Sequence, residues 1–200
     1  MRKPAILLTL LLACISLAGR SNAQILNGSF EPTTPFGGNF IVPTNSTAIP
    51  GWLTIDSGVE WYNPLPFGTG PAPAGSYIVD LANYVYSAGG LQQTFATTPG
   101  ELFEIDFKLS TTIGSGRDGT AQIEVSADGQ TQLFNVTNLT GVNVWQACTF
   151  TFTADNSSAT LRFRCLQNAN VHFANIDGVA RNLTTAARPS TFGRIKSLYR

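Results

Sequence analysis

The chain has 200 residues, with twelve basic and twelve acidic side chains, and this length predicts a single domain. The charge is unevenly distributed, because residues 24–180 hold four basic and twelve acidic side chains, a net charge of −8. A body this acidic argues against nucleic acid as a partner and is compatible with a cation site or with neutral ligands.

The first 23 residues have the features of a secretory signal peptide. Residues 1–3 supply positive charge, residues 5–19 form an apolar run without charge, and residues 21–23 are small side chains suited to cleavage after Ala23. The run is shorter than the roughly 20 residues of a spanning helix, so we expect no transmembrane segment. We therefore predict a secreted protein, extracellular or periplasmic; the alternative is a lipoprotein anchored through Cys14, because residues 11–14 resemble a lipoprotein box.

Four later segments alternate apolar and polar side chains with the period of two that is typical of half-buried strands. They cover residues 103–109, 122–126, 148–153 and 161–165, and Asp128-Gly129 predicts a hairpin turn after the second of them. Residues 32–50 and 62–76 are rich in Pro, Gly, Thr and Asn and are expected to form long loops. The predicted fold class is all-β, a two-sheet antiparallel β-sandwich over residues 24–180, followed by a basic, disordered tail at 181–200.

The two cysteines outside the leader, Cys148 and Cys165, share the apolar faces of their segments and should both point inward. If the two segments form one hairpin, these residues oppose each other; if the segments lie in opposite sheets, both thiols still face the shared core. An exported protein permits pairing, so we predict a disulfide, the alternative being two buried thiols.

Catalytic side chains in a recognisable arrangement are missing from the sequence, so we predict a protein that is not an enzyme. His172 is the single histidine and is expected to be structural. Glu60 and Asp80 are the carboxylate pair nearest the predicted ligand loops, but no sequence feature ties them together.

Sugar binding requires aromatic platforms and planar polar side chains, and the candidates gather between residues 61 and 93. The predicted ligand-binding residues are Trp61, Tyr62, Asn83, Tyr84, Tyr86 and Gln92. Trp61 and Tyr62 point to opposite faces, so we expect at most one of them to be buried. Gln93 shares its face with Leu91 and Phe95, and if buried it must be fully hydrogen-bonded.

Nine short motifs occur in a fixed order along the chain, and the order is more specific than any one of them. These are LNGSFE (26–31), IPGW (49–52), GVEWY (58–62), GSYIVDL (75–81), GGLQQTFATTPGELFEIDFKLS (89–110), VSADG (125–129), Trp145, FTFTADNSSATLRF (150–163) and NIDGV (175–179). In this order they resemble a galactose-binding-like jelly roll, closest to the family of unknown function shared by plant cell-wall proteins and bacterial choice-of-anchor C proteins. The chain departs from the family at Gly178, where the family usually has Asn, and its tail lacks the usual sorting signal.

The resemblance implies a non-catalytic domain that binds an extracellular polysaccharide or cell-surface glycan and associates with surfaces. The alternative is a structural or adhesive matrix protein that binds other proteins and no sugar. Related modules hold a structural calcium ion where the first and last strands meet, and the matching carboxylates here are Glu31 and Asp177. Phe30 would then fill the core while Glu31 turns toward the closing strand.

Overall fold

The computed structural model describes residues 24–82, 88–114, 116–166 and 172–182, so the predicted signal peptide and nearly all of the predicted tail lie outside the described residues. Within these ranges the chain forms thirteen strands and one short 3-10 helix, η1 (Leu65–Phe67). The strands are β1 (Asn39–Val42), β2 (Leu53–Asp56), β3 (Val59–Tyr62), β4 (Ile78–Asp80), β5 (Gly89–Ala96), β6 (Leu102–Ser110), β7 (Ile113–Gly114), β8 (Arg117–Asp118), β9 (Thr120–Ala127), β10 (Gln130–Thr137), β11 (Gln146–Thr153), β12 (Ser158–Cys165) and β13 (Asn175–Arg181). No helix in the described part of the chain is long and apolar enough to cross a membrane.

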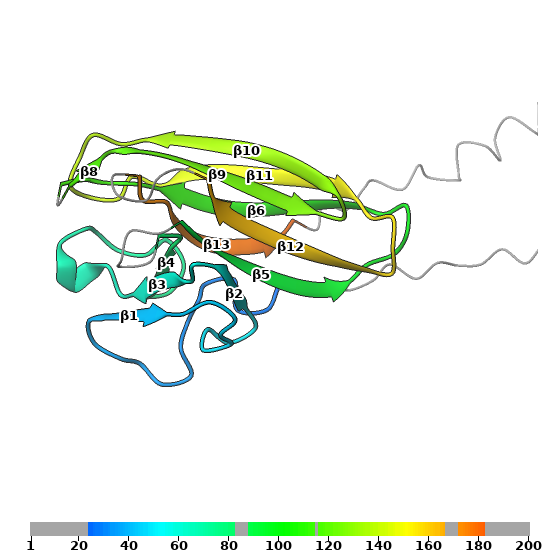
Figure 1. Ribbon diagram of the computed structural model, residues 1–200, viewed down its shortest axis with the longest axis horizontal. Coiled ribbons are helices and arrows are strands. Elements are labelled where there is room, and N and C mark those ends of the chain that lie inside the picture. The colour runs from blue at the N-terminus through cyan, green and yellow to red at the C-terminus, as the bar shows by residue number, and fades with distance from the viewer. Residues whose placement is uncertain (1–23, 83–87, 115, 167–171, 183–200) are drawn as a thin grey trace, which may run out of the picture.

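The long strands form two antiparallel sheets. One has the order β1-β3-β4-β13-β6-β11, the other has the order β10-β9-β12-β5-β2, and β7 pairs with β8 separately. Figure 1 shows the short strands β1, β3 and β4 gathered together below one end of the long strands. The predicted two-sheet antiparallel sandwich is confirmed.

The strand pairs are nested, which is the pattern of a jelly roll. β9 pairs with β10, β6 pairs with β11 around them, and β5 pairs with β12 outside both. Because β6 and β11 lie in one sheet and the other two pairs in the second sheet, the nested ribbon is folded over onto itself.

The core lies between the sheets and is formed by the inward side chains of the predicted alternating segments. Phe107 of β6 contacts Phe163 of β12 across the two sheets, with ring centroids 5.1 Å apart. Phe103 contacts Phe95 of β5 in the same way, at 5.8 Å. Each such side chain, once fully buried, contributes about 1.5–3 kcal/mol. The alternation predicted for these four segments is therefore confirmed by β6, β9, β11 and β12.

The predicted hairpin turn is also confirmed. Ala127 pairs with Gln130, and the two residues between them, Asp128 and Gly129, have φ values of 49° and 77°. Two consecutive positive φ values are the signature of the two-residue turn that suits the right-handed twist of paired strands. Asp128 then accepts a hydrogen bond from the Asn156 side chain, at 2.9 Å, which ties this turn to the β11–β12 connection.

The predicted disulfide is not formed. β11 and β12 do not form a hairpin but lie in opposite sheets, where Cys148 is the register partner of Phe107 and Cys165 that of Ile123. Both side chains are buried in the core, as expected from their faces. Burial raises the pKa of the Cys148 thiol, which keeps it protonated and unreactive.

The two predicted long loops contain short elements. Residues 32–50 include β1, which forms the edge of its sheet by pairing with β3, and residues 62–76 include η1. Composition alone missed both because a four-residue edge strand and a single 3-10 turn are too short to show a period.

Candidate functional site

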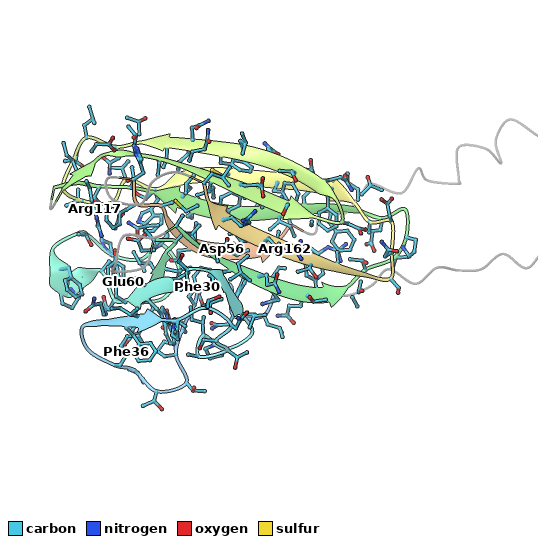
Figure 2. All side chains as sticks on the ribbon, in the orientation of Figure 1. Phe30, Phe36, Asp56, Glu60, Arg117 and Arg162 are labelled. Carbon is cyan, nitrogen blue, oxygen red and sulfur yellow. The ribbon has the colours of Figure 1, made fainter. Side chains whose placement is uncertain are left out.

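A pocket of about 530 Å³ opens at the end of the sandwich where η1 and the β7–β8 pair lie. Figure 2 shows Glu60 and Arg117 together at this end. The lining comes from six separate parts of the chain, and we call the site the Glu60–Arg117 pocket. Its residues are Asn39, Glu60, Tyr62, Phe67, Thr69, Thr112, Ile113, Gly114, Arg117, Gly141 and Phe173.

Two carboxylates lie side by side at this pocket. Glu60 of β3 and Asp80 of β4 are register partners, so their side chains project from the same face of the sheet. That face is opposite to the one that carries Val59 and Trp61 into the core. No sequence feature indicated this pairing, and the expectation that nothing ties the two carboxylates together is wrong.

Arg117 of β8 forms a salt bridge with Asp80, one of these two carboxylates. Its Nη2 donates to Asp80 Oδ2 at 3.3 Å, its Nη1 donates to the Thr112 hydroxyl at 3.3 Å, and its guanidinium lies 3.9 Å from the Phe173 ring centroid. Asp80 is fully buried, and burial raises the pKa of its carboxyl to about 7 even though Arg117 and the Ala82 amide favour the ionised form.

Glu60 has different surroundings. Its Oε1 accepts a hydrogen bond of 2.6 Å from the exposed Asn39 side chain, and the residue keeps 9% of its surface accessible. Among the described residues Glu60 forms no salt bridge, whereas Asp80 has Arg117. Glu60 therefore presents a carboxylate to the pocket that no basic side chain neutralises.

Aromatic side chains form the apolar part of the pocket. Tyr62 packs edge-to-face against Phe67 with ring centroids 5.5 Å apart, and Phe67 stays 51% exposed. The Tyr62 hydroxyl donates to Asn175 Oδ1 at 3.4 Å, and burial together with the Asp80 carboxylate raises the pKa of Tyr62. Tyr62 thus remains a protonated hydrogen-bonding group at the base of the pocket.

The structure places the predicted ligand residues in different parts of the molecule. Trp61 and Tyr62 are both buried, so the expectation that at most one would be is wrong: Trp61 points into the core, and the loop carrying η1 covers Tyr62 on the other face. Trp61 donates its Nε1 to the Phe30 carbonyl at 2.7 Å. Asn83, Tyr84 and Tyr86 lie outside the described residues.

Gln92 lies elsewhere, on the outer face of the second sheet. It lines a shallower groove of about 300 Å³, the Arg162 groove, and its Oε1 accepts from Arg162 Nε at 3.0 Å. Arg164 in the same groove already bridges Asp56 at 2.9 Å and Glu124 at 3.6 Å. Figure 2 places Asp56 and Arg162 nearer the middle of the molecule than Arg117. Among the described residues the groove has no aromatic lining: those residues are Ile55, Asp56, Gln92, Glu124, Ser126, Arg162 and Arg164.

Gln93, one residue on, is buried with every polar atom bonded. It accepts from the Leu26 amide at 2.7 Å and donates to the carbonyls of Leu26 and Gly51 at 2.9 and 2.7 Å. The expectation of a fully bonded structural side chain is confirmed.

The residues that open the domain form a compact turn rather than a strand; we call Asn27–Glu31 the opening turn. Phe30 is fully buried, as expected, although its φ of 53° lies in the left-handed region. The Asn27 side chain accepts from the Glu31 amide and donates to the Glu31 and Pro50 carbonyls. The Val179 amide donates to the Gly28 carbonyl at 2.8 Å, so the turn is attached directly to the last strand.

Glu31 and Asp177 both accept hydrogen bonds from backbone amides of residues 74–77. Glu31 Oε1 accepts from the amides of Ser76 and Tyr77 at 2.7 and 3.0 Å, and Asp177 Oδ2 accepts from the Ala74 amide at 2.8 Å. Asp177 is fully buried, and burial first, with a smaller contribution from Glu31, raises the pKa of its carboxyl to about 7. The described residues contain no group of three or more acidic, histidine or cysteine side chains placed to hold a metal.

A family model described as "Protein of unknown function (DUF642)" matches residues 23–180. No curated protein matches the chain.

Similar solved structures include a chain described as "EclA C-terminal domain; sugar-binding protein", with 19% identity over 46% of this chain and 64% of that chain and a TM-score of 0.39. This chain therefore spans slightly less than two thirds of that protein. TmCBM61 in complex with β-1,4-galactotriose has 16% identity over 66% of this chain and 88% of that chain, at a TM-score of 0.46. A CBM35 from Paenibacillus barcinonensis has 17% identity over 73% and 98%, at 0.43. Identities and scores this low carry no argument about what this chain binds.

Proposed function

Because this chain belongs to the DUF642 family of proteins of unknown function, its role must be inferred from its own residues, and we propose that it is a non-catalytic carbohydrate-binding domain. The observation that carries the proposal is the composition of the Glu60–Arg117 pocket. Its volume of about 530 Å³ lies within the roughly 300–1,000 Å³ of ordinary ligand sites.

The pocket combines the two kinds of group that recognise a sugar ring. The exposed ring of Phe67 offers a flat apolar surface for the C–H face of a pyranose. Glu60, Asn39 and Arg117 are planar polar groups suited to hydroxyl pairs, and hydrogen bonds to charged groups are the stronger ones. These groups are already held by neighbours before a ligand arrives, which lowers the entropic cost of binding.

The environment of the carboxylates favours binding over hydrolysis. A glycosidase needs two carboxyl groups on either side of a scissile bond. Here Asp80 is fully buried beneath Arg117, so a glycosidic oxygen has no access to it, and Glu60 is the one carboxyl group among the described residues that lines the pocket.

The same proposal includes export of the protein and its association with surfaces. The support for export is the signal-peptide pattern of residues 1–23.

A structural calcium ion at Glu31 and Asp177 also stays a prediction. In its favour, a buried carboxyl and a second carboxyl close by would gain from a cation between them. With two carboxylates available, such an ion would have to complete its six to eight oxygens from backbone carbonyls and water.

Affinity electrophoresis in gels containing soluble polysaccharides tests the proposal. We expect at least one neutral polysaccharide to retard the protein, and Glu60→Gln to weaken that retardation about tenfold, because the lost carboxylate hydrogen bonds are charge-assisted. Glu124→Gln, which removes the same charge from the Arg162 groove, is the matched control and should behave as wild type. The predicted contacts Tyr84 and Tyr86 are tested by replacing both with alanine.

No retardation across a wide panel would refute sugar binding and favour the alternative, a matrix protein that binds other proteins. Loss through Glu124→Gln but not Glu60→Gln would move the site to the Arg162 groove.

A further inference from the structure

The charges around the Glu60–Arg117 pocket are not balanced. Three charged side chains are close together: Glu60, Asp80 and Arg117. Arg117 is bonded to Asp80 at 3.3 Å, and Glu60 is bonded to the neutral amide of Asn39. When both carboxyls are ionised the pocket carries one net negative charge, and the accessible carboxylate is the one without a basic partner.

Arg117 is poorly placed to attract an anion in spite of lining the pocket. Its guanidinium is engaged on both sides, with Asp80 and Thr112 accepting from its nitrogens and the Phe173 ring lying against its face. An incoming carboxylate that reached one of the remaining donors would also approach Glu60, which lines the same pocket. Like charges at short distance repel most strongly where burial lowers the dielectric response.

Glu60, in contrast, has unused acceptor capacity. A carboxylate offers about four acceptor sites, and the Asn39 amide takes one of them on Oε1. A ligand ammonium could therefore donate to Glu60 while the exposed Phe67 ring covers the apolar face of the sugar.

On the basis of the proposed function, we infer that the Glu60–Arg117 pocket selects glycans by charge: it binds sugar units with a free amine more tightly than neutral units and excludes uronic acids. The net charge of −8 over residues 24–180 supports this order at longer range. Glu60 is the residue that determines the selectivity, and Phe67 contributes affinity without regard to ligand charge.

Isothermal titration with three sets of short oligosaccharides of equal length tests the inference: glucosamine oligomers, the same oligomers with every amine acetylated, and galacturonate oligomers. The first two sets share one backbone, so their ratio isolates the amine. At a pH slightly above 7, where Asp80 is largely ionised, and at physiological salt we expect the free amine to improve affinity about tenfold, and galacturonates not to bind.

Glu60→Gln should bring the ratio of the two affinities close to one, because glutamine keeps the acceptor for Asn39 but loses the charge. Glu124→Gln removes one negative charge, as Glu60→Gln does, but at a distant place, and it should leave the ratio unchanged, which separates local recognition from general attraction. Phe67→Leu is a second variant at an exposed position and should weaken both oligomers by the same factor. Circular dichroism melting of each variant shows whether it folds.

Equal or tighter binding of the acetylated oligomers would overturn the inference while leaving the proposed function standing. Binding of galacturonates would also overturn the inference. So would an affinity ratio, free amine over acetylated, that falls equally in Glu60→Gln and Glu124→Gln. If no oligosaccharide binds at all, the proposed function and the inference fail together.

Discussion

Replacing Gly28 with alanine tests whether the opening turn holds the start of the domain against its last strand. A Cβ at this position would lie 1.7 Å from the Val179 carbonyl oxygen and 2.7 Å from its carbonyl carbon. Both are backbone atoms, so no side-chain rotation relieves the clash. The turn must move away from β13 by more than an ångström.

That movement has a cost that follows from the contacts of the turn. It breaks the Val179–Gly28 hydrogen bond of 2.8 Å, which contributes about 0.5–1.5 kcal/mol. It also disturbs the fully buried Phe30, and overpacking of this kind costs about 1–3 kcal/mol. We therefore expect a loss of about 2–4 kcal/mol in the free energy of unfolding.

Urea unfolding followed by tryptophan fluorescence measures this loss as a lower midpoint at an unchanged slope. Gly37→Ala is the matched control, because a Cβ there meets nothing within 4 Å and its backbone is not left-handed, so we expect a change of less than about 1 kcal/mol. If Gly28→Ala unfolds at the same urea concentration as Gly37→Ala, the turn does not hold the chain ends together.

Three further predictions concern stability. Burial raises the pKa of Asp80 and Asp177 to about 7, so the folded state binds more protons than the unfolded one between about pH 4 and 7. Stability should therefore fall as the pH rises from 5 to 8, by up to about 3 kcal/mol for each carboxyl, and Asp177→Asn should reduce the fall; urea midpoints that increase with pH would contradict this. A reducing agent should leave the melting temperature unchanged, because no disulfide joins Cys148 and Cys165, and a drop of several degrees would show that the bridge exists. Calcium, if it binds at Glu31 and Asp177, should raise the melting temperature in a way that a chelator reverses and Glu31→Gln abolishes; identical melting curves with calcium and with chelator would remove it.

Local alternation was sufficient to predict four of the long strands and one turn. The inward side chains of β6, β9, β11 and β12 repeat every second residue, and Asp128-Gly129 supplies the two positive φ values that its hairpin needs. Such features depend on neighbours within a few positions, so they are visible in the sequence.

The pocket could not be predicted in the same way, because it depends on register between distant segments. Glu60 meets Asp80 only because β3 pairs with β4 in one register, and Arg117 reaches Asp80 from 37 residues further along the chain. One signal was present: Glu60 and Tyr62 share a face opposite to Val59 and Trp61. That parity indicated that a carboxylate and a tyrosine project together, but not what covers them.

The sequence likewise could not show in which sheet β11 and β12 each lie. Their connection is short enough for a hairpin, and the positions of Cys148 and Cys165 fit one equally well. The structure instead pairs β11 with β6 in one sheet and β12 with β5 and β9 in the other, which follows the nested pairing of the jelly roll.

Mapping of the contact by NMR tests the claim that the Glu60–Arg117 pocket binds glycan. An oligosaccharide of the glycan that retards the protein most would be titrated into the isotopically labelled protein while amide and arginine side-chain signals are followed. We expect the largest shifts at Glu60, Tyr62, Phe67 and Arg117, with the signals of Arg162 and Gln92 unchanged. Saturable shifts confined to the Arg162 groove, or an absence of shifts at the pocket while binding is saturated, would contradict the claim.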